Sequence, residues 1–153
     1  MIKDTISDDM INLRLRQLGA KSIKTTPAHV NIVKFAISDE VNITYLYEIK
    51  ETGEIYLQRV SPYLMMMGRL YTDRSLINMM IKDVELFRNA YNSRNYDKFI
   101  QLVNSHLRFG KDLESLFIGH NVSPEDLDEI LNRIEEGKQL LEDIRDRSKS
   151  VLD

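Results

Sequence analysis

The feature that most constrains the fold is a segment in which apolar and polar side chains alternate. Apolar or aromatic residues occupy every second position from Val41 to Ile49, and only Leu46 departs from the polar set between them. Alternation with period two predicts a β-strand with one buried face. Residues 55–60 have the same β-branched and aromatic character, and Gly53 lies between the two segments, where a hairpin turn favours a left-handed residue. The sequence therefore predicts an antiparallel hairpin.

The residues that flank this hairpin extend the predicted sheet. Residues 30–37 are rich in Val, Ile and Phe and predict a further strand. Residues 21–26 are a candidate fourth strand, because Lys21 and Lys24 suit the edge of a sheet. Ser61 followed by Pro62 is typical of a helix start, so we expect the sheet to end there. The prediction is an antiparallel meander of three to four strands.

Helical spacing dominates the remainder of the chain. Apolar residues recur every three or four positions after residue 72, and Gly110 and Gly119 are expected to end two of the helices. We expect an α+β fold with an N-terminal helix, the sheet, and a C-terminal region of four to five helices that includes 72–91, 96–110, 112–118 and 124–150. The length of 153 residues and the absence of a linker predict one domain, 1–153, with sub-regions 1–61 and 62–153.

The last predicted helix is long and amphipathic. Ser123 and Pro124 are typical of its cap and first turn. A heptad register places apolar residues on one stripe, which we predict to be an oligomer face, and Gly137 and Ser148 interrupt it. The residues of this face are Leu127, Ile130, Ile134, Leu141 and Ile144. Leu131 and Leu140 widen the stripe, which favours packing in a helical bundle, within the chain or antiparallel to a second copy, over a two-stranded zipper.

Composition excludes several classes of site. The chain has no Cys, so disulfides, zinc–thiolate centres and cysteine nucleophiles are excluded. No apolar run is as long as a membrane span, and the N-terminus lacks the apolar core of a signal peptide. We therefore expect a cytoplasmic protein that does not enter a membrane.

No group of residues predicts catalysis. The three histidines, His29, His106 and His120, lie far apart and lack the spacing of metal ligands. The six glycines are scattered, so no phosphate-binding loop is indicated, and no Gly-x-Ser-x-Gly motif occurs. We expect no catalytic residue, no cofactor and no metal site.

Methionine is concentrated in one part of the chain. Five of the seven methionines fall within sixteen residues: Met65, Met66, Met67, Met79 and Met80. Thioether side chains fill irregular cores and also line adaptable binding surfaces. We expect core packing for most of them and a partner-binding role as the alternative.

Charge is unevenly distributed, although the net charge is only −3. Residues 10–38 contain no acid and carry a possible basic patch of Arg14, Arg16, Lys21 and Lys24. Such a patch suits nucleic acid or an acidic protein. The negative net charge makes nucleic acid the less favoured partner.

These observations favour a non-enzymatic protein of bacterial or phage type, with a composition rich in Ile, Asn, Asp and Lys, that acts through protein–protein contacts as a homo-oligomer. One alternative is a nucleic-acid-associated regulator that uses the acid-free segment 10–38. The other is a small-molecule binder or enzyme with a pocket between sheet and helices.

Overall fold

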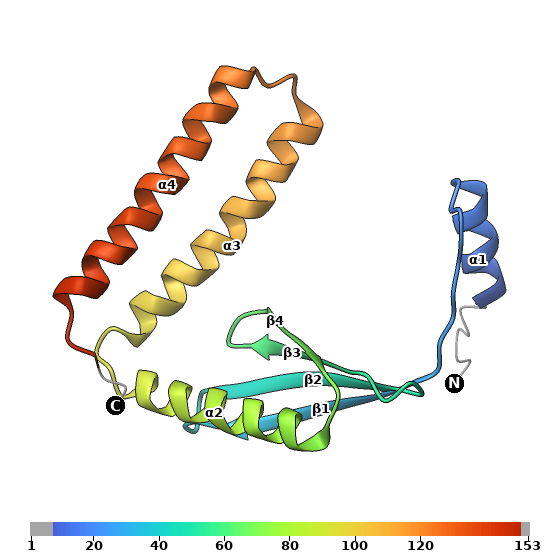
Figure 1. Ribbon diagram of the computed structural model, residues 1–153, viewed down its shortest axis with the longest axis horizontal. Coiled ribbons are helices and arrows are strands. Elements are labelled where there is room, and N and C mark those ends of the chain that lie inside the picture. The colour runs from blue at the N-terminus through green and yellow to red at the C-terminus, as the bar shows by residue number, and fades with distance from the viewer. Residues whose placement is uncertain (1–7, 151–153) are drawn as a thin grey trace. The chain divides into compact units, whose positions relative to one another are not determined.

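The computed structural model describes residues 8–150, and these form an α+β fold (Figure 1). The elements in chain order are α1 (Asp8–Gln17), β1 (Ala28–Ala36), β2 (Asn42–Lys50), β3 (Ile55–Ser61), β4 (Met65–Leu70), α2 (Asp73–Tyr91), α3 (Tyr96–Gly119) and α4 (Pro124–Arg147). The expected class is confirmed. In the described part of the chain three helices follow the sheet, where four to five were expected.

The sheet is an antiparallel meander in the order β1-β2-β3-β4. The predicted hairpin is present, with Ile49 opposite Ile55 and Tyr47 opposite Leu57. Gly53 has a φ of +82°, and its N–H donates to the Lys50 carbonyl oxygen at 2.8 Å. This conformation favours glycine because a Cβ would be strained there.

The fourth strand is not where the sequence predicted it. Residues 21–26 form no strand, and Ser61–Pro62 leads into β4, which pairs with β3, instead of opening a helix. The apolar run before Gly68 lacks alternation, and the pairing of β3 with β4 shifts between Leu57 and Gln58. Gly68 lies opposite Leu57 with a φ of +127°, as expected for a glycine at such an irregularity.

The helices also differ in one respect from the prediction. α3 runs through Gly110 without interruption, so the predicted helices 96–110 and 112–118 are one. One glycine weakens a helix by only about 1 kcal/mol, which the rest of a 24-residue helix offsets. The start of α4 is confirmed, since Ser123 Oγ accepts a hydrogen bond from the Asp126 N–H at 3.1 Å and Pro124 follows the cap.

The core lies between the sheet and α2, which covers one sheet face (Figure 1). Ile43, Tyr45 and Leu57 of the sheet are fully buried. The helix contributes the side chains that follow its inner face at helical spacing: Leu76, Met80, Val84 and Phe87. These side chains give the first hundred residues an apolar core of their own. Val30 and Ile32 of β1 are exposed.

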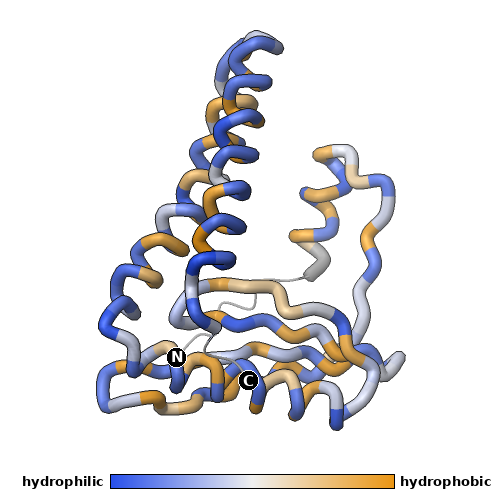
Figure 2. Tube along the Cα trace, turned by 60° about the vertical axis from the view of Figure 1, so that its left-hand side comes forward, coloured by the Kyte–Doolittle hydropathy of each residue, from blue (hydrophilic) through white to orange (hydrophobic). Residues whose placement is uncertain are grey.

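The chain divides into two compact units, one up to Ile100 and one from Gln101 onward. In the second unit α3 and α4 form an antiparallel helical hairpin with a short loop (Figures 1 and 2). Apolar segments recur along both helices between hydrophilic ones (Figure 2). That the whole chain is one domain stays a prediction.

Candidate functional site

The helical hairpin of the second unit is the largest region without a core. None of the described residues from Gln101 to Ser150 is buried. Of the predicted oligomer face, Leu127, Ile130 and Ile134 are half-buried, whereas Leu141 is 64% exposed and Ile144 38%. The predicted stripe is thus partly covered at its start and open towards its end.

The exposed apolar surface extends beyond the predicted stripe. Leu131 and Leu140 of α4 are exposed, as the widened heptad pattern indicated. α3 adds residues that the sequence analysis did not single out: Leu102, Leu107, Phe109, Leu116, Phe117 and Ile118. Leu102, Phe109 and Leu116 recur every seven positions and share one side of the helix, whereas Leu107 and Ile118 lie on the opposite side. Exposed apolar patches mark interaction surfaces in soluble proteins.

The two ends of α4 differ in charge. The first turn carries Glu125 and Asp126, and the last turn carries Arg145 and Arg147 on either side of Asp146. This arrangement complements the helix dipole. The ion pairs of the helix middle, Arg133 with Glu136 at 3.0 Å and Lys138 with Glu135 at 2.9 Å, are exposed and add little stability.

The methionine cluster does not form one surface. Met80 is buried in the core, and Met67 and Met79 are half-buried against it. Met65 and Met66, on β4, are exposed. Most of the cluster therefore packs in the core, and a partner-binding role remains a prediction for the two exposed residues.

The predicted basic patch is exposed. Arg14 and Arg16 lie in the last turn of α1, and Lys21 and Lys24 in the segment before β1. Arg14 Nη1 donates to Gln17 Oε1 at 3.3 Å. Contact of this patch with nucleic acid stays a prediction.

The histidines lie apart and exposed, His29 on β1, His106 on α3 and His120 after α3. Within residues 8–150 no three His, Asp or Glu side chains converge as metal ligands. No described helix is long and apolar enough to cross a bilayer.

A buried ion pair joins β3 to α2. Arg59 Nη1 donates to both carboxylate oxygens of Asp83 at 2.8 Å, and the Tyr45 hydroxyl donates to Asp83 Oδ2 at 2.7 Å. Arg59 is only 2% exposed. Burial raises the pKa of the Tyr45 hydroxyl far above its usual value near 10, and the bond to Asp83 raises it further. These three side chains therefore hold a fixed polar centre inside the apolar core.

The guanidinium of Arg59 has further contacts. Its central carbon lies 4.4 Å from the centre of the Tyr63 ring and 4.5 Å from that of Phe87, close enough for cation–π attraction. Its Nη2 donates to Met65 Sδ at 3.3 Å, and its buried Nε has no hydrogen-bond partner among the described residues. A pocket of about 280 Å³ adjoins it, with Arg59, Asp83, Tyr63, Phe87, Leu86 and Phe99 in its wall.

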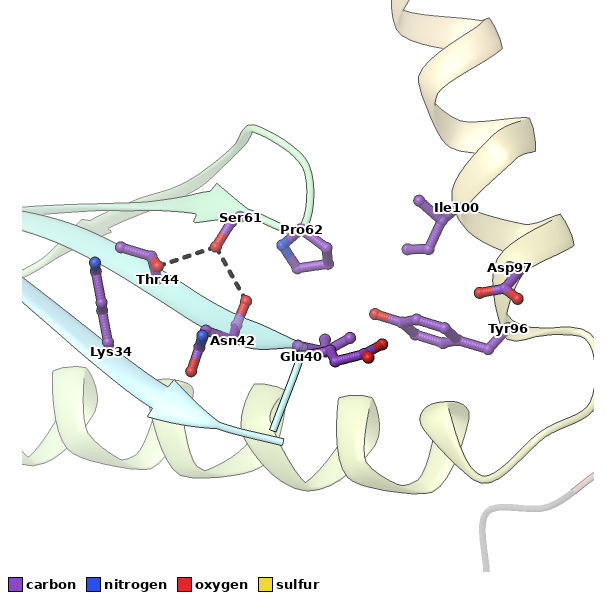
Figure 3. Close-up of a pocket in the computed structure, with 10 residues that line it drawn as sticks. Lys34, Glu40, Asn42, Thr44, Ser61, Pro62, Tyr96, Asp97 and Ile100 are labelled. Atoms are coloured by element: carbon purple, nitrogen blue, oxygen red, sulfur yellow. Dashed lines mark hydrogen bonds between the residues drawn. The ribbon is translucent and has the colours of Figure 1, made fainter. Parts of the chain in front are cut away.

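A second, more polar pocket of about 560 Å³ lies where β2 begins and β3 ends (Figure 3). Its wall includes Lys34, Glu40 and Asp97, and the buried Tyr96 points its hydroxyl towards Glu40 and Pro62 (Figure 3). Burial raises the pKa of the Tyr96 hydroxyl, and the nearby Asp97 adds to the effect.

The hydroxyl of Ser61 in this second pocket is not activated as a nucleophile. Its Oγ lies 3.1 Å from the Asn42 carbonyl oxygen and 3.0 Å from Thr44 Oγ1. Neither atom is a base strong enough to take the proton. The pocket can bind polar groups, and these contacts of Ser61 provide no catalytic pair.

Comparisons of the chain with protein-family models, with curated proteins and with solved structures found no match.

Proposed function

We propose that this protein acts through protein–protein contacts and that its α3–α4 hairpin associates with the hairpin of a second copy. The observation that carries the proposal is the complete lack of buried residues between Gln101 and Ser150 in the described chain. Helices of this length gain most of their stability from tertiary packing. Two helices alone leave their apolar stripes open to water.

A second hairpin would complete a four-helix bundle. Such bundles bury the apolar stripes of all four helices around one core and are joined by short loops. The loop between Gly119 and Pro124 meets this requirement. Burial stabilises the assembly by roughly 25 cal/mol for each Å² of apolar surface removed from water.

The apolar stripe and the charges at its two ends favour a second copy of this chain as the occupant. If two α4 helices run antiparallel, the first turn of one, with Glu125 and Asp126, lies beside the last turn of the other, with Arg145 and Arg147. In that register Leu127 lies opposite Ile144, and Ile130 opposite Leu141. In that register Asp126 of each copy lies opposite Arg145 of the other, twice in one dimer because the pair is symmetric, whereas Glu125 lies opposite Asp146.

The test is a charge exchange between two variants of the full chain. One variant carries Arg145→Glu and Arg147→Glu, and the other Glu125→Lys and Asp126→Lys. Each alone places like charges together and is expected to weaken the dimer by about tenfold. A mixture of the two restores opposite charges at both ends, so sedimentation should show mixed dimers of near wild-type affinity.

Circular dichroism of each variant checks that the helices persist. If each variant associates as tightly as the wild type, or if mixing restores nothing, the antiparallel pairing is wrong.

A further inference from the structure

We propose that the pocket beside Arg59 binds an uncharged, largely apolar ligand whose carbonyl oxygen accepts hydrogen bonds from Nε and Nη2 of the guanidinium. The site lies wholly within the first hundred residues. Of the α3–α4 hairpin it uses only the start of α3, through Phe99, and it does not depend on the self-association proposed above.

The unused donors of Arg59 indicate an acceptor. A guanidinium carries five N–H groups. Nη1 donates to the carboxylate of Asp83. Nη2 donates only to the thioether of Met65, a weak acceptor, and Nε has no acceptor among the described residues. Nε and Nη2 lie along one edge of the guanidinium plane. One carbonyl oxygen at that edge would accept from both.

The charges around the guanidinium favour an uncharged ligand. Asp83 already neutralises Arg59, and the rings of Tyr63 and Phe87 lie near its centre. A carboxylate on the ligand would leave one negative charge without a counter-charge beside apolar walls, which is unfavourable. An amide, ester or ketone satisfies the donors without adding charge.

The remaining wall residues favour a ligand with an apolar body. Tyr63, Leu86, Phe87 and Phe99 line an open pocket of about 280 Å³. This lies near the lower end of the range of small-molecule sites. A single aromatic or aliphatic ring with a short carbonyl arm matches that size, and its ring would lie among the aromatic side chains.

Met65 is the movable cover of this site. Its sulfur touches Nη2, and its side chain is unbranched and 46% exposed on the edge strand β4. Methionine changes rotamer readily. Because Nε itself is buried, the ligand carbonyl would take the position of the thioether sulfur and displace it.

The experiment follows the ¹³C-labelled methyl group of Met65 by NMR in the full-length chain during titration with phenylacetamide and, separately, with phenylacetate. Comparison with the spectrum of Met65→Leu assigns the resonance. Phenylacetamide is expected to shift this resonance saturably and to bind at least tenfold more tightly than phenylacetate. Arg59→Lys keeps a positive charge for Asp83 but removes the Nε donor, so it should weaken amide binding about tenfold.

Phe99→Ala shortens an exposed wall residue and should also weaken binding, whereas Tyr71→Ala, an exposed aromatic residue outside the pocket wall, should not. Comparison of the Phe99 and Tyr71 variants tests the site even if Arg59→Lys does not fold. The proposal is overturned if the amide leaves the Met65 resonance unmoved, if phenylacetate binds as tightly as the amide, or if Phe99→Ala and Tyr71→Ala bind alike.

Discussion

Arg59 occupies a position of β3 where the alternation of the strand calls for an apolar side chain. Ile55 and Leu57 precede it on the same face, and all three are buried. A charge in this register is the one sequence signal that could have identified the polar centre. Its partner Asp83 lies 24 residues away on α2. The pairing depends on how α2 docks on the sheet, and no local pattern encodes that.

The Arg59–Asp83 pair yields the first stability prediction. Asp83→Ala leaves a buried guanidinium without its counter-charge, so the free energy of unfolding should fall by about 3–5 kcal/mol. Urea unfolding of the variant measures it. Glu85→Ala, an exposed change on the same helix, is the matched control and should stay within about 0.5 kcal/mol of the wild type. A loss below about 1 kcal/mol for Asp83→Ala would show that the pair contributes little to the fold.

At the scale of elements, the clearest local patterns were predicted well and the irregular ones were not. The hairpin β2–β3, helix α2 and the start of α4 follow from alternation, helical spacing and a Ser–Pro cap. β4 was not predicted because its apolar run does not alternate and because Ser61–Pro62 is typical of a helix start. The sequence analysis divided α3 at Gly110 because glycine is common at helix ends. The low helix propensity of this one residue is offset by the rest of the 24-residue helix.

The two kinds of glycine give opposite predictions. Gly110 lies inside α3, and a Cβ added there would meet no neighbouring side chain within 4 Å, so Gly110→Ala should raise the free energy of unfolding by about 0.5–1 kcal/mol. Gly53 has a φ of +82°, so Gly53→Ala should lower it despite equally open space. Thermal unfolding followed by circular dichroism measures both. The same sign for the two variants would contradict this account of the glycines.

For the whole molecule, the sequence predicted the α+β class and an amphipathic last helix, but not where the core ends. The buried cluster closes with Tyr96, at the start of α3. Heptad patterns indicate that a stripe is apolar, and they do not say what covers it. The pocket beside Arg59 could not be predicted from the sequence either, because its wall residues come from β3, β4, α2 and the start of α3.

The central claim is that two copies cover each other's helical hairpins. Sedimentation equilibrium of the full chain, from micromolar to near-millimolar concentration, tests it most directly. We expect the mass of two chains, and Leu140→Glu with Leu141→Glu should return the mass of one, since both leucines are exposed in the single chain. A wild-type protein that keeps the mass of one chain at the highest concentration would contradict the account.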